Sequence, residues 1–125
     1  MSIPSGGGAS ALISAASSKL GSPYVWGAKG PNSFDCSGFV YWCLNQVGVN
    51  QSYLTSSGWR NVGRYTKITN FNDIQAGDIV VVRGHVGIAA GGGTVIDASS
   101  SNGRVVHRSL SQWWANNFIC AWRIF

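Results

Sequence analysis

The sequence predicts a single α+β domain in which N-terminal helices pack on an antiparallel sheet of five or six strands. Its 125 residues are enough for one hydrophobic core but too few for two ordinary domains. Apolar residues recur at helical spacing only in the first half of the chain, whereas the second half consists of short β-rich segments separated by turn residues. Helices followed by a meander of strands are typical of the α+β class.

Two helices are expected in the first half. Over residues 10–20 the apolar side chains recur at helical spacing, and Gly21 follows directly as a helix terminator. A second helix is expected to begin near Ser33 or Asp35 and to stop at Gly48. The two helices together would cover one face of the sheet.

The chain becomes rich in β-branched residues after Gly77-Asp78. Five strands are expected there, over residues 79–83, 86–90, 94–98, 105–108 and 118–124. Residues 50–75 are polar and mixed, and one short helix near residues 56–62 is the only element expected in them.

The N-terminal segment differs in composition from the rest of the chain. Residues 1–8 end in three consecutive glycines and are expected to form a flexible tether, which leaves residues 9–125 as the domain. The opening residues lack the charged start and the long apolar stretch of a secretion signal, and no stretch is apolar over the length of a membrane span. A role outside the cell would therefore need another route of export.

The chain is basic, with nine Lys and Arg against four Asp and Glu and a net charge of +5. Such a charge favours a polyanionic partner through long-range attraction. The cations are scattered and form no dense run, so we expect no nucleic-acid partner. The cysteines number three, which argues against a disulfide framework, and we expect no metal, no cofactor and a monomer.

Among the cysteines, Cys36 is the candidate nucleophile. Cys43 and Cys120 lie in apolar runs and are expected to be small buried hydrophobes. Cys36 instead stands at the expected start of the second helix, where unpaired backbone N–H groups and the positive end of the helix dipole favour a thiolate. The same N–H groups can hold the oxyanion of an attacked carbonyl. The position alone also allows that Cys36 merely adjoins a helix cap.

A cysteine nucleophile requires a base, and His85 and His107 are the only histidines. His85 opens a strand after a bend, whereas His107 lies within an alternating strand and is expected at the surface. The glycines at 91–93 predict a hairpin between the strands that carry His85 and Asp97. An odd-numbered loop or a bulge would place both side chains on one face, so that Asp97 accepts the Nδ1–H of His85. Otherwise Asp97 would be a strand-end residue that faces water.

Four short motifs occur along the chain in a specific order. They are Pro23-Tyr24-Val25-Trp26-Gly27, Asp35-Cys36-Ser37-Gly38-Phe39-Val40, Ala76-Gly77-Asp78-Ile79-Val80 and Gly84-His85-Val86-Gly87-Ile88-Ala89. Their order and spacing resemble the NlpC/P60 family of cell-wall cysteine peptidases, over nearly the whole chain from about Ser10 to Phe125. The resemblance implies a compact papain-like fold.

The resemblance also implies an activity. It points to a bacterial or phage cysteine endopeptidase that hydrolyses peptidoglycan stem peptides through a thioester acyl-enzyme. The expected bond joins γ-D-glutamate to a diamino acid, either meso-diaminopimelate or lysine. Cys36 would be the nucleophile and His85 the base, while Asp97 occupies the third position, where the family usually has His. Tyr24 would lie beside Cys36 with its hydroxyl near the reacting carbonyl.

Substrate contacts are expected from five positions, namely Tyr24, Trp26, Asp35, Ser37 and Trp59. Asp35 and Ser37 would help to bind the N-terminal portion of the stem peptide. The expected place of action is the cell wall or periplasm, outside the cytoplasm. Anionic wall polymers there would be a partner for the +5 charge.

Two alternatives keep the same fold. The first is a peptidoglycan amidase or thiol acyltransferase that works through the same thioester. The second is a non-catalytic wall-binding module. The presence of both Cys36 and His85 argues against the second alternative, because a binding module does not need that pair.

Overall fold

The computed structural model describes residues 8–125, so most of the expected tether, residues 1–7, lies outside the described residues. The helical elements are α1 (Gly8–Ser17), α2 (Cys36–Gln46), the 3-10 helices η2 (Gly58–Asn61) and η3 (Phe71–Asp73), and α3 (Gln112–Asn117). The strands are β1 (Thr66–Ile68), β2 (Ile79–Val82), β3 (His85–Gly91), β4 (Thr94–Ser99), β5 (Arg104–Ser109) and β6 (Phe118–Arg123). None of the helices within residues 8–125 has the length and apolar composition that crossing a bilayer requires.

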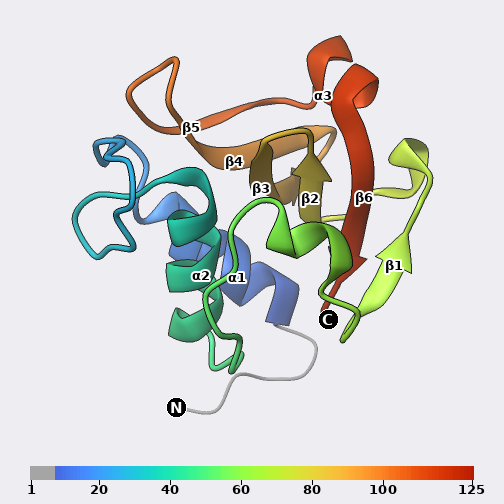
Figure 1. Cartoon of the computed structure of the whole chain (residues 1–125), viewed down its shortest axis with the longest axis horizontal. Coiled ribbons are helices and arrows are strands. Elements are labelled where there is room, and N and C mark those ends of the chain that lie inside the picture. The colour runs from blue at the N-terminus through green and yellow to red at the C-terminus, as the bar shows by residue number, and fades with distance from the viewer. Residues whose placement is uncertain (1–7) are drawn as a thin grey trace.

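The strands form one six-stranded antiparallel sheet in the order β1-β6-β2-β3-β4-β5. Helices α1 and α2 lie side by side against it (Figure 1) and contact β3, with α2 also contacting β4. This arrangement confirms the expected α+β fold and all five expected strands. Strand β1 was not expected, because three residues in a polar stretch carry no clear periodicity.

The two expected helices are both present, with one difference in length. Helix α2 begins directly after Asp35 and gives way to a turn before Gly48, which has a φ of +81°. Helix α1 ends at Ser17 and not at residue 20, and Leu20 is 45% exposed. The chain tightens there into turns, with Leu20 N–H donating to the carbonyl of Ser17, so Leu20 leaves the apolar face.

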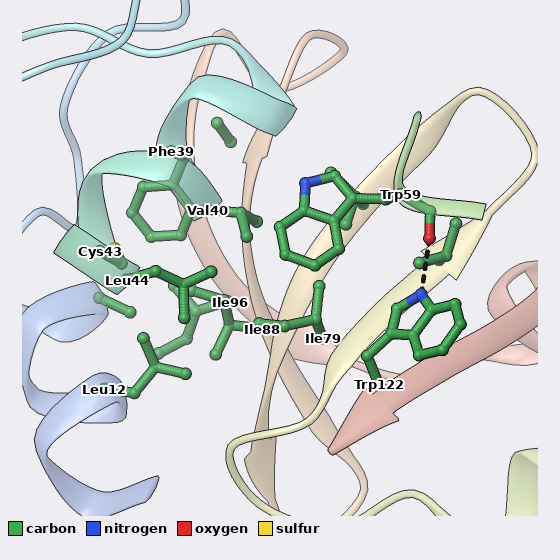
Figure 2. Packing of buried hydrophobic residues seen from close by; sticks show 14 of the residues in the cluster. Leu12, Phe39, Val40, Cys43, Leu44, Trp59, Ile79, Ile88, Ile96 and Trp122 are labelled. Carbon is green, nitrogen blue, oxygen red and sulfur yellow. Dashed lines mark hydrogen bonds between the residues drawn. The ribbon is translucent and has the colours of Figure 1, made fainter. Parts of the chain in front are cut away.

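The main hydrophobic core lies between the two long helices and one face of the sheet. Figure 2 shows Leu12 of α1 and Leu44 of α2 pointing toward Ile79, Ile88 and Ile96 of the central strands. All five side chains are fully buried. Residues at every second strand position face these helices, because successive side chains in a strand point to opposite faces.

The opposite face of the sheet carries a smaller apolar cluster around Trp114 of α3. The buried side chains that pack with it are Val80, Val82, Ala89 and Val95. Helix α3 was not expected, since its six residues are too few to show a helical period. His85 and Asp97 lie an even number of positions from Ala89 and Val95 in their strands. Because alternate side chains share a face, both also lie on the α3 face.

Trp59 of η2 completes the core beside α2, which corrects the expectation that it contacts substrate. Its side chain is 1% exposed, and its carbonyl accepts a hydrogen bond of 2.6 Å from Nε1 of Trp122. Figure 2 shows its ring beside Val40 and Ile79. An aromatic residue in a polar stretch suggests a binding residue, whereas this ring fills space in the main core.

Candidate active site

Cys36 is the first residue of α2 and is half-buried. Asp35 caps the helix, because its carboxylate accepts the backbone N–H of Gly38 at 2.6 Å and that of Gly27 at 3.0 Å. A Cβ on Gly38 would come within 2.0 Å of the carbonyl oxygen of Ala28, so only glycine allows this close approach. The cap therefore fixes the 27–28 loop and the thiol-bearing helix start relative to each other.

Two tyrosines and a serine surround this helix start. The Ser37 hydroxyl lies 3.3 Å from a carboxylate oxygen of Asp35 and 2.9 Å from the Tyr53 hydroxyl. Burial raises the pKa of Tyr24, and the nearby charges of Cys36 and Asp35 raise it further. The Tyr24 phenol thus lies beside Cys36 and keeps its proton, so it can act as a hydrogen-bond donor.

His85 opens β3 and contacts both Asp97 and Cys36. Its Nε2 lies 2.7 Å from Oδ2 of Asp97, and the interaction of the ring with Cys36 contributes to a raised pKa of the imidazole. The sequence leads us to expect Nδ1 toward Asp97, whereas the structure places Nε2 there. The orientation of an imidazole about its χ angles is not encoded in strand register, so the sequence does not determine which nitrogen is used.

The protonated form of His85 is stabilised in this environment. Burial lowers the pKa of the imidazole, but the hydrogen bonds to Asp97 and Cys36 and the charges of both groups outweigh burial and raise it to about 9. The ring is also enclosed by aromatic side chains, with its centroid 5.4 Å from that of Trp114 and 6.3 Å from that of Trp113. At neutral pH His85 is accordingly an imidazolium.

A β-bulge brings His85 and Asp97 to the same face. Ala89 pairs with Val95 but Gly91 pairs with Thr94, so one extra residue lies in β3 between these pairs. The hairpin loop itself has two residues, Gly92 and Gly93, with φ angles of +62° and +73°. The expected bulge is thus confirmed. With a two-residue loop and no bulge, His85 and Asp97 would point to opposite faces of the sheet; the bulge places them on the same face.

Arg108 completes the polar cluster and was not singled out from the sequence. Its Nε lies 3.0 Å from Oδ1 of Asp97 and its terminal nitrogen 2.6 Å from Oδ2, a bidentate ion pair with a carboxylate that is 0% exposed. Val95 pairs with Arg108 across β4 and β5, which sets the Arg108 side chain diagonal to Asp97 on one face. Predicting the register of the β4–β5 hairpin from the sequence would have revealed the contact between Arg108 and Asp97.

The other histidine and cysteines lie apart from this cluster. His107 is exposed, and its Nε2 is 2.8 Å from the Thr94 hydroxyl. Cys43 and Cys120 are fully buried, and burial raises the pKa of both thiols, so they remain protonated. Within residues 8–125, no group of His, Cys, Asp and Glu side chains is arranged to hold a metal ion.

The remaining expected substrate contacts differ in accessibility. Trp26 is 87% exposed on the loop before α2, so its ring is free to meet a ligand. Asp35 and Ser37 are 7% and 4% exposed, and their polar atoms bond each other and the surrounding chain. Only their outermost atoms can reach a ligand.

A cleft of about 460 Å³ opens beside His85. Its lining comprises Arg83, Gly84, His85, Ser99, Ser100, Ser101, Arg108 and Trp113. These residues come from the β2–β3 turn, the end of β4 and the loop after it, β5, and α3. The cleft is therefore bounded on one side by the imidazole and is rich in hydrogen-bond donors.

A thiol at a helix N-terminus, an imidazole close enough to interact with it and a buried carboxylate bonded to the imidazole form the constellation of a cysteine hydrolase. The comparisons with known proteins agree with this class. Residues 21–123 match the NlpC/P60 family. The chain is 43% identical over 103 residues to a protein of Corynebacterium glutamicum named as a probable endopeptidase, covering 80% of this chain and 47% of that protein.

Solved structures give the same result. The NlpC/P60 domain of the peptidoglycan hydrolase SagA superposes with a TM-score of 0.76 at 33% identity, covering 93% of this chain and 98% of that domain. The peptidoglycan hydrolase RipB of Mycobacterium tuberculosis gives a TM-score of 0.79 at 28% identity, covering 98% and 69% of the two chains. The chain belongs to the NlpC/P60 family. It spans less than half the length of the Corynebacterium relative, of which it covers 47%.

Proposed function

We propose that this domain is a cysteine endopeptidase that hydrolyses peptidoglycan stem peptides at the bond between γ-D-glutamate and a diamino acid. The observation that carries the proposal is the hydrogen bond between His85 and the buried Asp97, on a ring that also interacts with Cys36. Membership of the NlpC/P60 family and the likeness to peptidoglycan hydrolases support the substrate class. The place of action would be the cell wall or periplasm.

Acylation begins from the Cys36 thiolate paired with the His85 imidazolium. The sulfur attacks the γ-carbonyl carbon of D-glutamate, and the carbonyl oxygen becomes an oxyanion. The Cys36 backbone N–H at the helix start and the protonated Tyr24 hydroxyl are the proposed donors to this oxyanion. As the C–N bond breaks, His85 gives its proton to the departing amine, which leaves a thioester on Cys36.

Deacylation reverses these roles. Neutral His85 takes a proton from a water molecule, whose oxygen attacks the thioester carbon and releases the γ-carboxyl product and the thiolate. Asp97 holds the imidazole by its Nε2 throughout, so that Nδ1 faces the reacting groups. Arg108 holds both oxygens of the buried Asp97 carboxylate and acts as a positioning residue.

The acyl half of the substrate would lie over the α2 start. Asp35 accepts hydrogen bonds from Gly38, Gly27 and Ser37, which use three of about four acceptor positions on a carboxylate. The remaining lone pair faces the α-amine or amide of the stem peptide, with Tyr24 and the exposed Trp26 beside it. Anionic wall polymers are the proposed source of attraction for the +5 charge.

Mass spectrometry of muropeptides after digestion of defined cell walls tests the proposal. We expect new fragments that end in γ-D-glutamate and fragments that begin with the diamino acid, and none with the Cys36→Ala protein. Cleavage between the lactyl group and L-alanine would instead identify an amidase. Binding to walls with no product would identify a wall-binding module.

A further inference from the structure

The cleft beside His85 lies on the side of the site where the amine product leaves. A general acid must touch the amine that it protonates, so the departing amine lies against the His85 ring. The cleft is lined by His85 but by none of Tyr24, Asp35 and Cys36, which surround the acyl side. Its volume of about 460 Å³ falls in the range of small-ligand sites, roughly 300–1,000 Å³.

The positive charge of this cleft comes from His85 and from two arginines, only one of which is free to bind a ligand. Arg108 is held by both oxygens of Asp97. Arg83 is exposed in the turn between β2 and β3, and no ion pair or hydrogen bond of its side chain occurs within residues 8–125. Its backbone N–H donates 3.0 Å to the carbonyl of Asn117, which fixes the turn that carries the guanidinium.

The other residues that line the cleft add hydrogen-bond donors but no acidic side chain. Ser99, Ser100 and Ser101 supply hydroxyl groups at the end of β4, and Ser99 is held by hydrogen bonds from Asn102. Asp97, which lies behind the lining, is 0% exposed and paired with His85 and Arg108. In Figure 1 the β2–β3 turn, the loop after β4 and α3 all lie at the upper end of the sheet. A cationic group with hydroxyls and without a competing acid fits a carboxylate.

We infer that this cleft binds a carboxylate carried by the amine half of the substrate, with the Arg83 guanidinium as its partner. The inference rests on the proposed function, because it assigns the leaving amine to the cleft. In substrate terms, it favours a diamino acid with a second carboxylate, meso-diaminopimelate, over lysine, which ends in an ammonium group. An ammonium group would meet the positive charge of Arg83 and be disfavoured there.

Binding measurements test the inference separately from catalysis. The probes are L-Ala-γ-D-Glu-meso-diaminopimelate and the same tripeptide with the side-chain carboxylate of diaminopimelate amidated. They are titrated against the Cys36→Ala protein, which cannot turn them over. We expect the free acid to bind roughly 3- to 10-fold more tightly than the amide. Adding Arg83→Gln should bring that ratio close to one, whereas Arg104→Gln, which removes an exposed arginine outside the cleft, should leave it unchanged.

The possible outcomes separate the hypothesis of a carboxylate site at Arg83 from the hypothesis of the proposed endopeptidase activity. An equal affinity for both tripeptides, or a ratio that Arg83→Gln does not reduce, overturns the inference even if the parent protein cleaves walls as proposed. A ratio that depends on Arg83 supports the cleft as a carboxylate site. If the parent protein then cleaves neither tripeptide, the proposed bond is wrong while the binding site stands. The ratio of kcat/KM for the two tripeptides with Cys36 present should follow the affinity ratio.

Discussion

The two faces of the sheet bury different kinds of side chain. The face under α1 and α2 packs large apolar residues such as Leu44 and Ile88. The α3 face has a smaller apolar cluster around Trp114, and next to it the buried ion pair of Asp97 and Arg108. The comparison teaches that the larger apolar core and the polar cluster of His85, Asp97 and Arg108 lie on opposite faces, and that the first residue of α2 is a meeting point between them.

That meeting point is the place of the largest expected effect. Cys36→Ala should reduce hydrolysis to the uncatalysed background, because no other described thiol is ionisable near an imidazole. The free energy of unfolding of the Cys36→Ala protein should change by at most about 1 kcal/mol, since the Cys36 side chain is half-buried. Muropeptide release and urea unfolding measure the two quantities. Cys43→Ala, a change within the core, should retain activity per folded molecule; loss of hydrolysis in that folded variant would contradict the assignment.

Asp97→Asn tests whether the α3 face supplies the chemistry. We expect kcat/KM to fall roughly 10²- to 10⁴-fold, because the imidazole loses its charged partner. The parent should lose activity at alkaline pH as His85 gives up its proton with a pKa of about 9. Since Asp97 raises that pKa, the alkaline limb of the variant should move to lower pH. The control is Asp73→Asn, at an exposed carboxylate, and equal pH profiles for parent and Asp97→Asn would disprove the orienting role.

Leu44→Ala tests the opposite face. The side chain is fully buried between α2 and the sheet, so its loss should lower the free energy of unfolding by about 2–5 kcal/mol. Urea unfolding measures this change, and kcat/KM per folded molecule should stay near that of the parent. Leu20→Ala is the matched control, because Leu20 is 45% exposed and should change stability by less than about 0.5 kcal/mol. Similar losses for the two leucines would show that the core is misplaced.

Arg108→Gln should give the smallest effect of the four. It leaves the buried Asp97 carboxylate with His85 as its only charged partner, so the free energy of unfolding should fall by roughly 1–3 kcal/mol. Arg104→Gln on the same strand, with an exposed side chain, should have no measurable effect. Urea unfolding at two salt concentrations tests whether this loss of stability comes from a buried ion pair, because salt screens a buried pair less than a surface pair. A loss that disappears at high salt would place the pair at the surface.

The sequence predicts the fold class and the main members of the site because both follow from local patterns. Cys36 and His85 stand at the starts of regular elements, where a helix cap and a turn mark their places. Arg108 could not be distinguished from the other scattered cations, because its role depends on the register of two strands. The burial of Trp59 could not be predicted for a related reason, since only tertiary packing decides whether an isolated aromatic is buried.

The bulge at Ala90 has a consequence for how the β3–β4 hairpin can change in length. Because Ala90 is the unpaired residue, deleting it would leave the Ala89–Val95 and Gly91–Thr94 pairs in place and keep Asp97 on the same face as His85. Removing one residue from the paired stretch between Val95 and Asp97 would instead turn Asp97 toward α1 and α2, where a carboxylate would meet only hydrocarbon. A one-residue deletion compatible with activity is therefore expected at Ala90 and not within that paired stretch.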